Sequence, residues 1–231
     1  MTRTALIVAH GQPSDPAGAE ADLARVAAAV GALLPGWVVK AATLAAPGAL
    51  ERALLSLTDP VIVPLFMADG FFTRVLLPGR LGKAGQAGLP TLPPFGLWPE
   101  TAAIAARAAI AAAGARGWQT GKTTLLLAAH GSGKGPLAAE AARTIAARIA
   151  RHASFAAMPL GFIEEPPFLA DAARGMPAQS LCLPLFVARW GHVRDDVPAA
   201  LAEAGFPGDV LDPVGLLAEV PGLIAARLGG V

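Results

Sequence analysis

Short apolar runs bounded by Gly and Pro alternate along the chain with longer, Ala-rich segments that carry scattered charges. The short runs are typical of strands, and the longer segments favour helices. In the C-terminal half this pattern predicts strands near 123–129, 155–163, 179–187 and 209–213, and helices near 136–152, 167–175, 194–204 and 216–228. In the N-terminal half it predicts strands near 4–9, 37–44, 60–67 and 91–95. Strands that are apolar throughout indicate a parallel sheet covered on both faces, so the predicted fold class is α/β.

The chain contains an internal repeat with an offset of about 120 residues, and such a repeat determines the architecture. Thr4–Gly11 (TALIVAHG) matches Thr124–Gly131 (TLLLAAHG), and Pro64–Phe66 matches Pro184–Phe186 (PLF in both). The sequence therefore predicts two tandem similar units, each a four-stranded parallel, doubly wound sheet flanked by helices, with the active cleft between them. We expect the N-terminal domain to span residues 1–116 and the C-terminal domain residues 122–231, divided at the glycine-rich segment GARGWQTG.

Composition excludes several classes of protein. Only 15% of the 231 residues are charged and the net charge is +1, which favours a compact globular protein without a basic surface for nucleic acid. The sequence has no run of about 18 to 20 apolar residues that could cross a membrane, and the apolar stretch after Arg3 is too short for a signal peptide. We therefore expect a cytoplasmic protein. The one cysteine, Cys182, lies in the apolar run SLCLPLF and is predicted to be a core residue.

Polar residues follow three successive predicted strands of the C-terminal unit. His130 follows the first strand, Glu164 and Glu165 follow the second, and His192 follows the third. Ligands of doubly wound α/β units bind beyond the carboxyl ends of the strands, so we expect these side chains on one rim. Two imidazoles and a carboxylate suit Fe²⁺, Co²⁺, Ni²⁺ or Zn²⁺, and imidazoles also transfer protons near neutral pH.

The N-terminal unit lacks most of this set. His10 follows its first strand, but Ala45 and Ala46 stand at the positions of the two glutamates and Phe72 stands at the position of His192. The N-terminal unit is therefore predicted to hold no complete site. For His10 three roles stay open, namely a relic of the duplication, a substrate contact or a proton donor.

Four segments of the second half carry a specific resemblance. They are AAHGS (Ala128–Ser132), GFIEEPPFL (Gly161–Leu169), LPLFVARWGHVRDDVP (Leu183–Pro198) and DPVGLLAEVPGLI (Asp212–Ile224). In this order they resemble the class II tetrapyrrole chelatases, the CbiX-type sirohydrochlorin chelatase family. The first half matches the same pattern in outline, which implies the long form of the family, in which two copies of the short unit are fused.

That resemblance implies an enzyme that inserts a divalent metal, Fe²⁺ or Co²⁺, into sirohydrochlorin for siroheme or cobalamin biosynthesis. His130 and His192 would be the metal-binding and catalytic histidines, with Glu164 or Glu165 as the acidic partner. The metal is then a substrate, and no prosthetic group is expected. The fused halves resemble a dimer made covalent, which favours a monomer.

The substrate of that family carries eight carboxylates around its rim, so the site should offer cations and N–H donors. The candidates are Ser132 and Lys134 in a glycine-rich turn, Arg189 and Arg194 near His192, and Arg74, the repeat equivalent of Arg194. His10 is added as a further candidate contact. Each of the cations could equally be a solvated surface residue.

Two other functions compete with a chelatase. A carrier of tetrapyrrole or metal could share this architecture without turnover. A histidine phosphatase begins with a similar strand and His-Gly, but it needs an arginine before the histidine, and Ala9 and Ala129 stand there. The phosphatase is the weaker alternative.

Overall fold

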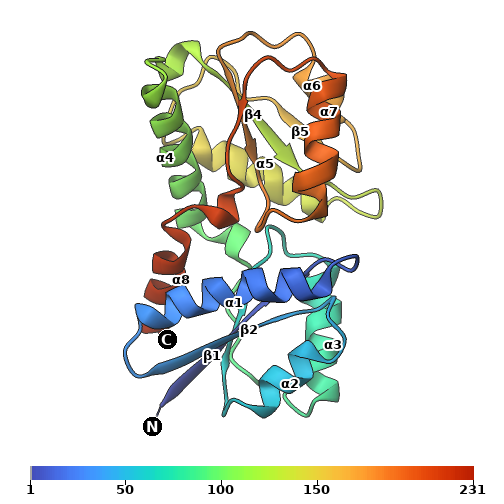
Figure 1. Cartoon of the computed structure of the whole chain (residues 1–231), viewed down its shortest axis with the longest axis vertical. Helices are drawn as coiled ribbons and strands as arrows, with labels where there is room; N and C mark the ends of the chain where they lie inside the picture. Colours follow the sequence, from blue (N-terminus) through green and yellow to red (C-terminus); the bar gives the residue numbers. More distant parts are fainter. Residues whose placement is uncertain (1) are drawn as a thin grey trace. The chain divides into compact units, whose positions relative to one another are not determined.

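The computed structural model describes residues 2–231 and contains two parallel β-sheets flanked by helices (Figure 1). The predicted α/β class is confirmed. The first repeat forms β1 (Arg3–Ala9), α1 (Pro16–Ala32), β2 (Trp37–Thr43), α2 (Ala49–Leu55), β3 (Val61–Pro64), η1 (Phe72–Leu76), α3 (Leu77–Lys83) and α4 (Pro99–Ala115). The second repeat forms β4 (Thr124–Ala129), α5 (Leu137–Ile149), β5 (Leu160–Phe162), α6 (Leu169–Ala173), β6 (Ser180–Pro184), η4 (His192–Asp196), α7 (Val197–Glu203), β7 (Asp209–Val210) and α8 (Val220–Gly229).

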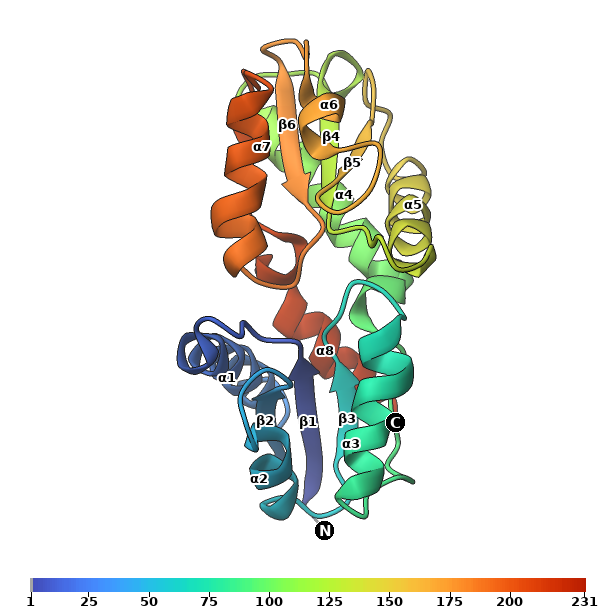
Figure 2. The ribbon, with the colours of Figure 1, turned by 90° about the vertical axis from the view of Figure 1, so that its right-hand side faces the viewer.

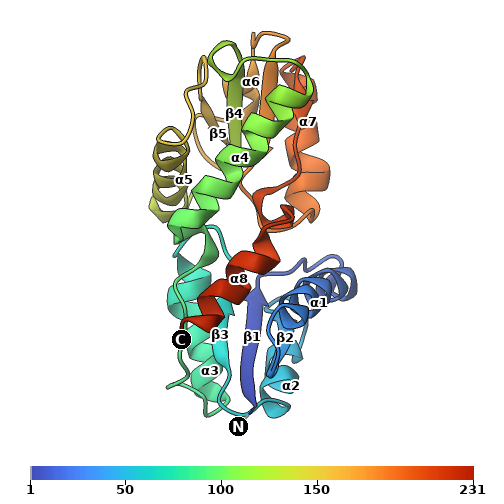
Figure 3. The ribbon, with the colours of Figure 1, turned by 90° about the vertical axis from the view of Figure 1, so that its left-hand side faces the viewer.

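The first sheet has the strand order β2-β1-β3, with β1 in the centre and all pairs parallel. Ala5–Ala9 of β1 are fully buried, because this strand has neighbours on both edges and helices on both faces. Figure 2 shows α2 and α3 on one face of the sheet, and Figure 3 shows α1 and α8 on the opposite face. The apolar run that predicted this strand is therefore the centre of a core.

The second sheet repeats this plan with the order β5-β4-β6-β7, again all parallel. Its central strand β4 is buried along its whole length. Helices α6 and α7 cover one face, and α4 and α5 cover the other (Figures 2 and 3). Because the strands are parallel, the loops after β4, β5 and β6 all leave the same edge of the sheet.

The prediction of a fourth strand in the first unit is wrong. Residues 91–95 form only an isolated bridge between Thr91 and Ile62. Pro90, Pro93 and Pro94 have no backbone N–H, so a ladder cannot extend along this segment. In the second unit the expected strand 155–163 shrinks in the same way to β5, with Pro159 before it and a single bridge at Ala157.

The compact units differ from the sequence repeats in their last helix. One unit comprises the described residues up to Phe95 together with Ala218–Val231, and the other comprises Gly96–Leu217. Helix α4 ends the first repeat but packs against α5 and β6, whereas α8 ends the second repeat and packs against α1. Each repeat thus supplies a covering helix to the other unit, and the predicted dividing segment at 114–121 lies inside the second compact unit.

None of the helices within residues 2–231 is both long enough and apolar enough to cross a membrane.

Cys182 is a core residue. It lies in β6 with no exposed surface, among the side chains between the second sheet and helices α6 and α7. Burial raises the pKa of its thiol to about 12, because the thiolate would lose its hydration.

We therefore expect Cys182 to resist thiol reagents in the folded protein, since at pH 8 almost none of it is the reactive thiolate. Titration with Ellman's reagent should give no rapid release of chromophore from native protein and one equivalent after denaturation. Rapid stoichiometric labelling of the native protein would contradict the burial described here.

Candidate active site

Two histidines from distant parts of the sequence meet at the carboxyl edge of the second sheet. His130 follows β4 directly, and His192 is the first residue of η4, which follows β6. Their Nε2 atoms lie 3.0 Å apart although the residues are 62 positions apart in sequence. The rings are nearly perpendicular, at 88°, with centroids 4.3 Å apart. Two of the polar groups predicted for this rim are therefore brought together.

The loop after β4 fixes the orientation of His130. Its Nδ1 lies 2.9 Å from the carbonyl oxygen of Gly131, which can only accept a hydrogen bond. Gly131 has φ +71°, and a Cβ there would lie 2.8 Å from Cγ of Glu165. A glycine is thus required both by the backbone conformation and by the close approach of the glutamate. The conformation directs Nε2 of His130 toward His192.

The turn that carries His192 is a π turn. In η4 the N–H of Val197 donates to the carbonyl of His192, five residues earlier. The equivalent η1 in the first unit has the same length, and each turn is followed by a proline in the first turn of the next helix, Pro198 or Pro78. Proline cannot complete the regular i−4 hydrogen bond, so the widened turn accommodates it. Within η4, Nδ1 of His192 lies 2.6 Å from Oδ2 of Asp196.

The two candidate glutamates have different environments. Oε1 of Glu165 accepts the backbone N–H of Ser132 at 2.7 Å, so this carboxylate holds the loop after His130. Glu164 donates its backbone N–H to the carbonyl oxygen of His130 at 2.9 Å, and the residue is exposed. In the part of the chain that the structure describes, no three His, Cys, Asp or Glu side chains form a group that could hold a metal ion. The predicted set is thus assembled as a histidine pair, without either glutamate in the group.

The predicted substrate cations lie on exposed parts of the two units. Arg189 forms an ion pair with Asp212, and Nε of Arg74 pairs with Oδ2 of Asp69 at 2.9 Å. Arg194 is exposed in η4. Lys134 is exposed in the turn after His130, where its backbone N–H donates to Oγ of Ser132 at 3.2 Å. Ser132 and Lys134 follow β4, and Arg189 and Arg194 follow β6, so all four lie at the carboxyl edge of the second sheet. Arg74 lies in η1 of the first unit.

The first unit keeps the same geometry with different chemistry. Nδ1 of His10 lies 2.9 Å from the carbonyl oxygen of Gly11, as in the second unit. The ring that packs against His10 is Phe72, with centroids 4.3 Å apart and planes at 75°. The first unit therefore presents one histidine Nε2 atom at the place where the second unit presents two.

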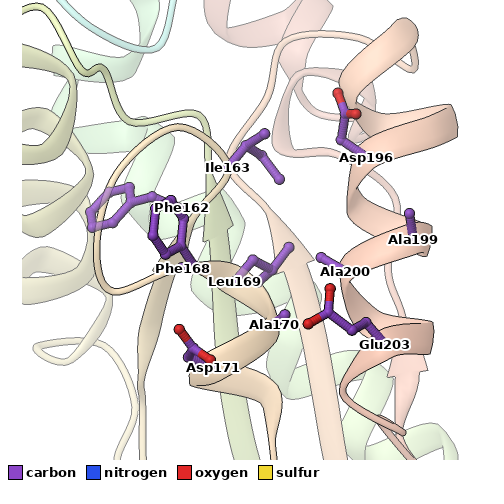
Figure 4. A pocket seen from close by; sticks show the side chains of 10 residues that line it. All are labelled: Phe162, Ile163, Phe168, Leu169, Ala170, Asp171, Asp196, Ala199, Ala200 and Glu203. Atoms are coloured by element: carbon purple, nitrogen blue, oxygen red, sulfur yellow. The ribbon is translucent and has the colours of Figure 1, made fainter.

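A pocket of about 370 Å³ lies between α6 and α7. Figure 4 shows Asp196 at one end of it and Asp171 and Glu203 at the other. Arg174 lies within 3.7 Å of Asp171 and 3.6 Å of Glu203, so these two carboxylates share a cation. Among the residues that line this pocket, Asp196 also contacts His192.

Asp196 is absent from the candidates predicted from the sequence. The available signal was its position four residues after His192, because side chains at i and i+4 of a helical turn face each other.

Comparison with known proteins identifies the family. The CbiX family model matches residues 124–229. A solved structure described as CbiX, the terminal enzyme for biosynthesis of siroheme in denitrifying bacteria, is 50% identical, covers 99% of both chains and has a TM-score of 0.91. No curated protein sequence matches the chain.

More distant structures share the fold. SirB from Bacillus subtilis with Fe³⁺ is 13% identical, has a TM-score of 0.75 and covers 99% of this chain and 95% of its own. The sirohydrochlorin chelatase SirB from Bacillus subtilis subspecies spizizenii, in complex with cobalt, is 14% identical, has a TM-score of 0.68 and covers 98% of this chain and 94% of its own. The resemblance stated from the sequence motifs is confirmed by the 50% identity over the whole length: this chain belongs to the CbiX family.

Proposed function

We propose that the chain is a sirohydrochlorin chelatase that inserts Fe²⁺ or Co²⁺ into the macrocycle for siroheme or cobalamin biosynthesis, acting as a monomer. The observation that supports this most strongly is the pair of Nε2 atoms, 3.0 Å apart, at the carboxyl edge of a sheet. It stands in a chain that is 50% identical to a CbiX described as the terminal enzyme of siroheme biosynthesis.

The spacing of the two nitrogens suits one shared metal ion. Imidazole nitrogens bind such an ion at about 2.0–2.1 Å, and an angle of about 90–110° between them puts them about 2.8–3.4 Å apart. His130 and His192 would therefore hold the ion without moving far. Two ligands leave further coordination positions open, so the ion can pass to the ring nitrogens of the substrate.

Insertion also requires two pyrrole N–H protons to leave as the ion enters. A neutral imidazole that releases the metal regains a lone pair, which can accept a proton. His130 and His192 would thus give up the metal and take up the two pyrrole protons, one on each imidazole. The imidazoles would then release these protons to water. Charge balances, because one divalent cation replaces two protons in the macrocycle.

We assign the acidic role to Glu164 and a structural role to Glu165. The Glu165 carboxylate is already bound to the Ser132 N–H, and its Cγ packs beneath Gly131. Glu164 is exposed in the same loop, one backbone hydrogen bond from His130, so its carboxylate is free to reach an incoming ion. Metal binding would then draw Glu164 toward the histidine pair.

Cations around the pair would bind the carboxylates of the substrate. Lys134 and Arg194 are exposed beside His130 and His192, and Ser132 adds a hydroxyl. Arg189 can exchange its partner Asp212 for a substrate carboxylate, because both side chains are more than half exposed. Substrate contacts by Arg74 and His10 of the first unit stay predictions.

The test is anaerobic incubation of the purified protein with sirohydrochlorin and Fe²⁺ or Co²⁺, followed through the absorption of the ring. We expect insertion well above the enzyme-free rate with at least one of the two ions. Rates equal to the enzyme-free control would contradict a chelatase. In that case, binding of the macrocycle without conversion would indicate a carrier, and release of phosphate from a phosphomonoester would indicate a phosphatase.

A further inference from the structure

We propose that Asp196 is a positioning residue of the metal site, which holds His192 in the tautomer and orientation that aim its Nε2 lone pair at the ion. The inference rests on the proposed function, because it assigns a role within the same site. Asp196 itself is not proposed to bind the metal.

The hydrogen bond between Asp196 and His192 determines which nitrogen of His192 can bind a cation. Oδ2 of Asp196 lies 2.6 Å from Nδ1 of His192, and a carboxylate can only accept. Nδ1 therefore carries the hydrogen, and in the neutral ring the lone pair is on Nε2. The Gly131 carbonyl imposes the same tautomer on His130. Two lone pairs then face each other across 3.0 Å, an arrangement that favours a cation between them.

The first repeat contains the same turn without the histidine and the aspartate. Phe72 and Leu76 occupy the positions of His192 and Asp196 at the same offset, in the π turn η1 of equal length. The ring of Phe72 packs as the ring of His192 does in the second unit. Its centroid lies 4.3 Å from the ring centroid of His10 and 6.3 Å from that of Phe66. The corresponding separations of His192 are 4.3 Å from His130 and 6.4 Å from Phe186.

This comparison separates a role in folding from a role in the site. Because η1 and α3 form with leucine at position 76, a carboxylate at this place is not needed to build the turn or to start the helix. The histidine and the aspartate are instead present together in one unit and absent together from the other. The aspartate therefore serves the histidine, as carboxylates do for many metal-binding histidines.

The pocket beside α7 makes the role testable by chemical rescue. Asp196 lines this pocket, and its side chain is 48% exposed, so a small carboxylic acid anion can reach the space left by truncation (Figure 4). Formate has the acceptor oxygens of the missing side chain and is small enough for a pocket of about 370 Å³. A substitution that merely unfolded the turn would not respond to formate.

The experiment measures Co²⁺ binding, through its visible absorption, in wild type, Asp196→Ala, Asp196→Asn and the control Asp195→Ala. We expect Asp196→Ala to weaken Co²⁺ binding about 10- to 100-fold, the usual effect of losing such a partner. Asp196→Asn should lose less, because its amide oxygen still accepts the Nδ1 hydrogen. Excess formate should recover part of the loss in Asp196→Ala only. Asp195→Ala removes the neighbouring charge and should stay within about twofold of wild type by the same reasoning.

Three results would each overturn the inference. The first is wild-type affinity for Co²⁺ in Asp196→Ala, the second is an equal loss of affinity in Asp196→Ala and Asp195→Ala, and the third is a loss in Asp196→Ala that formate does not reduce. The readout is separate from turnover. If wild type binds Co²⁺ in this Asp196-dependent way but never inserts it, the proposed chelatase function fails while the positioning role stands. If wild type inserts metal and Asp196→Ala binds Co²⁺ normally, only the positioning role fails.

Discussion

Replacing His192 by phenylalanine is expected to lower kcat/KM for metal insertion at least about 100-fold, since the ring loses both a metal ligand and a proton acceptor. Phenylalanine is a well-matched substitution, because Phe72 occupies this position in the first repeat with the same centroid distance of 4.3 Å to the preceding histidine. The loss should therefore arise from chemistry and not from packing. Insertion kinetics and Co²⁺ titration of the folded variant measure it, and both should fall together.

His130→Ala should behave like His192→Phe, whereas His10→Ala should lose much less. His10 has the same contact with its following glycine, but the ring that packs against it is Phe72 and not a second imidazole. An equal loss at His10 would mean that the first unit takes part in catalysis directly. Full activity in His192→Phe would show that the histidine pair is not the metal site.

The reverse substitution is expected to create a metal site in the first unit. In a His192→Phe background, the changes Phe72→His and Leu76→Asp should restore one equivalent of bound Co²⁺ per chain. The reason is that His10 already has the tautomer that exposes Nε2, and the ring at position 72 already lies at the required distance. Equilibrium dialysis with Co²⁺ gives the stoichiometry directly.

Affinity at the new site should be lower than at the native one, because Ala45 and Ala46 replace the two glutamates of the second unit. Leu76 packs at the edge of the first core, so circular dichroism must show that the variant is folded. Phe72→His without Leu76→Asp should bind Co²⁺ more weakly than the combined change. A folded combined variant that binds no Co²⁺ would contradict the assignment of the ion to paired histidines held in this way.

The histidine pair could be predicted from the sequence because its position depends on topology alone. Runs such as LLLAA and LCLP are apolar throughout, which predicts parallel strands, and the residues that follow parallel strands share one edge. The repeat predicted in addition that the first unit has no complete site, since Phe72 stands at the position equivalent to His192.

The roles of the glutamates and of Asp196 could not be predicted in the same way. Glu164 and Glu165 are adjacent in a loop, and their directions depend on the left-handed conformation of Gly131 and on its contact with Glu165. The four-residue spacing of His192 and Asp196 is compatible with a contact, but it does not predict the π turn in which the contact forms. The direction of a side chain within a loop depends on tertiary contacts, and the hydrophobic pattern of the sequence does not predict these contacts.

The exchange of covering helices between the two units could not be predicted from the sequence either. Helices α4 and α8 are both largely apolar segments with proline in the first turn, and both follow a short segment with a 3₁₀ turn. Their patterns predict two helices but not which sheet each one covers. Only the packing of α4 on α5 and of α8 on α1 distinguishes the two arrangements.

The most direct measurement is the anomalous scattering of cobalt in crystals of the protein grown with Co²⁺. We expect one ion within about 2.0–2.3 Å of Nε2 of both His130 and His192, with Glu164 and not Glu165 as its third protein ligand. A cobalt ion bound elsewhere, or bound by one of these histidines alone, would contradict the paired site on which the proposed function depends.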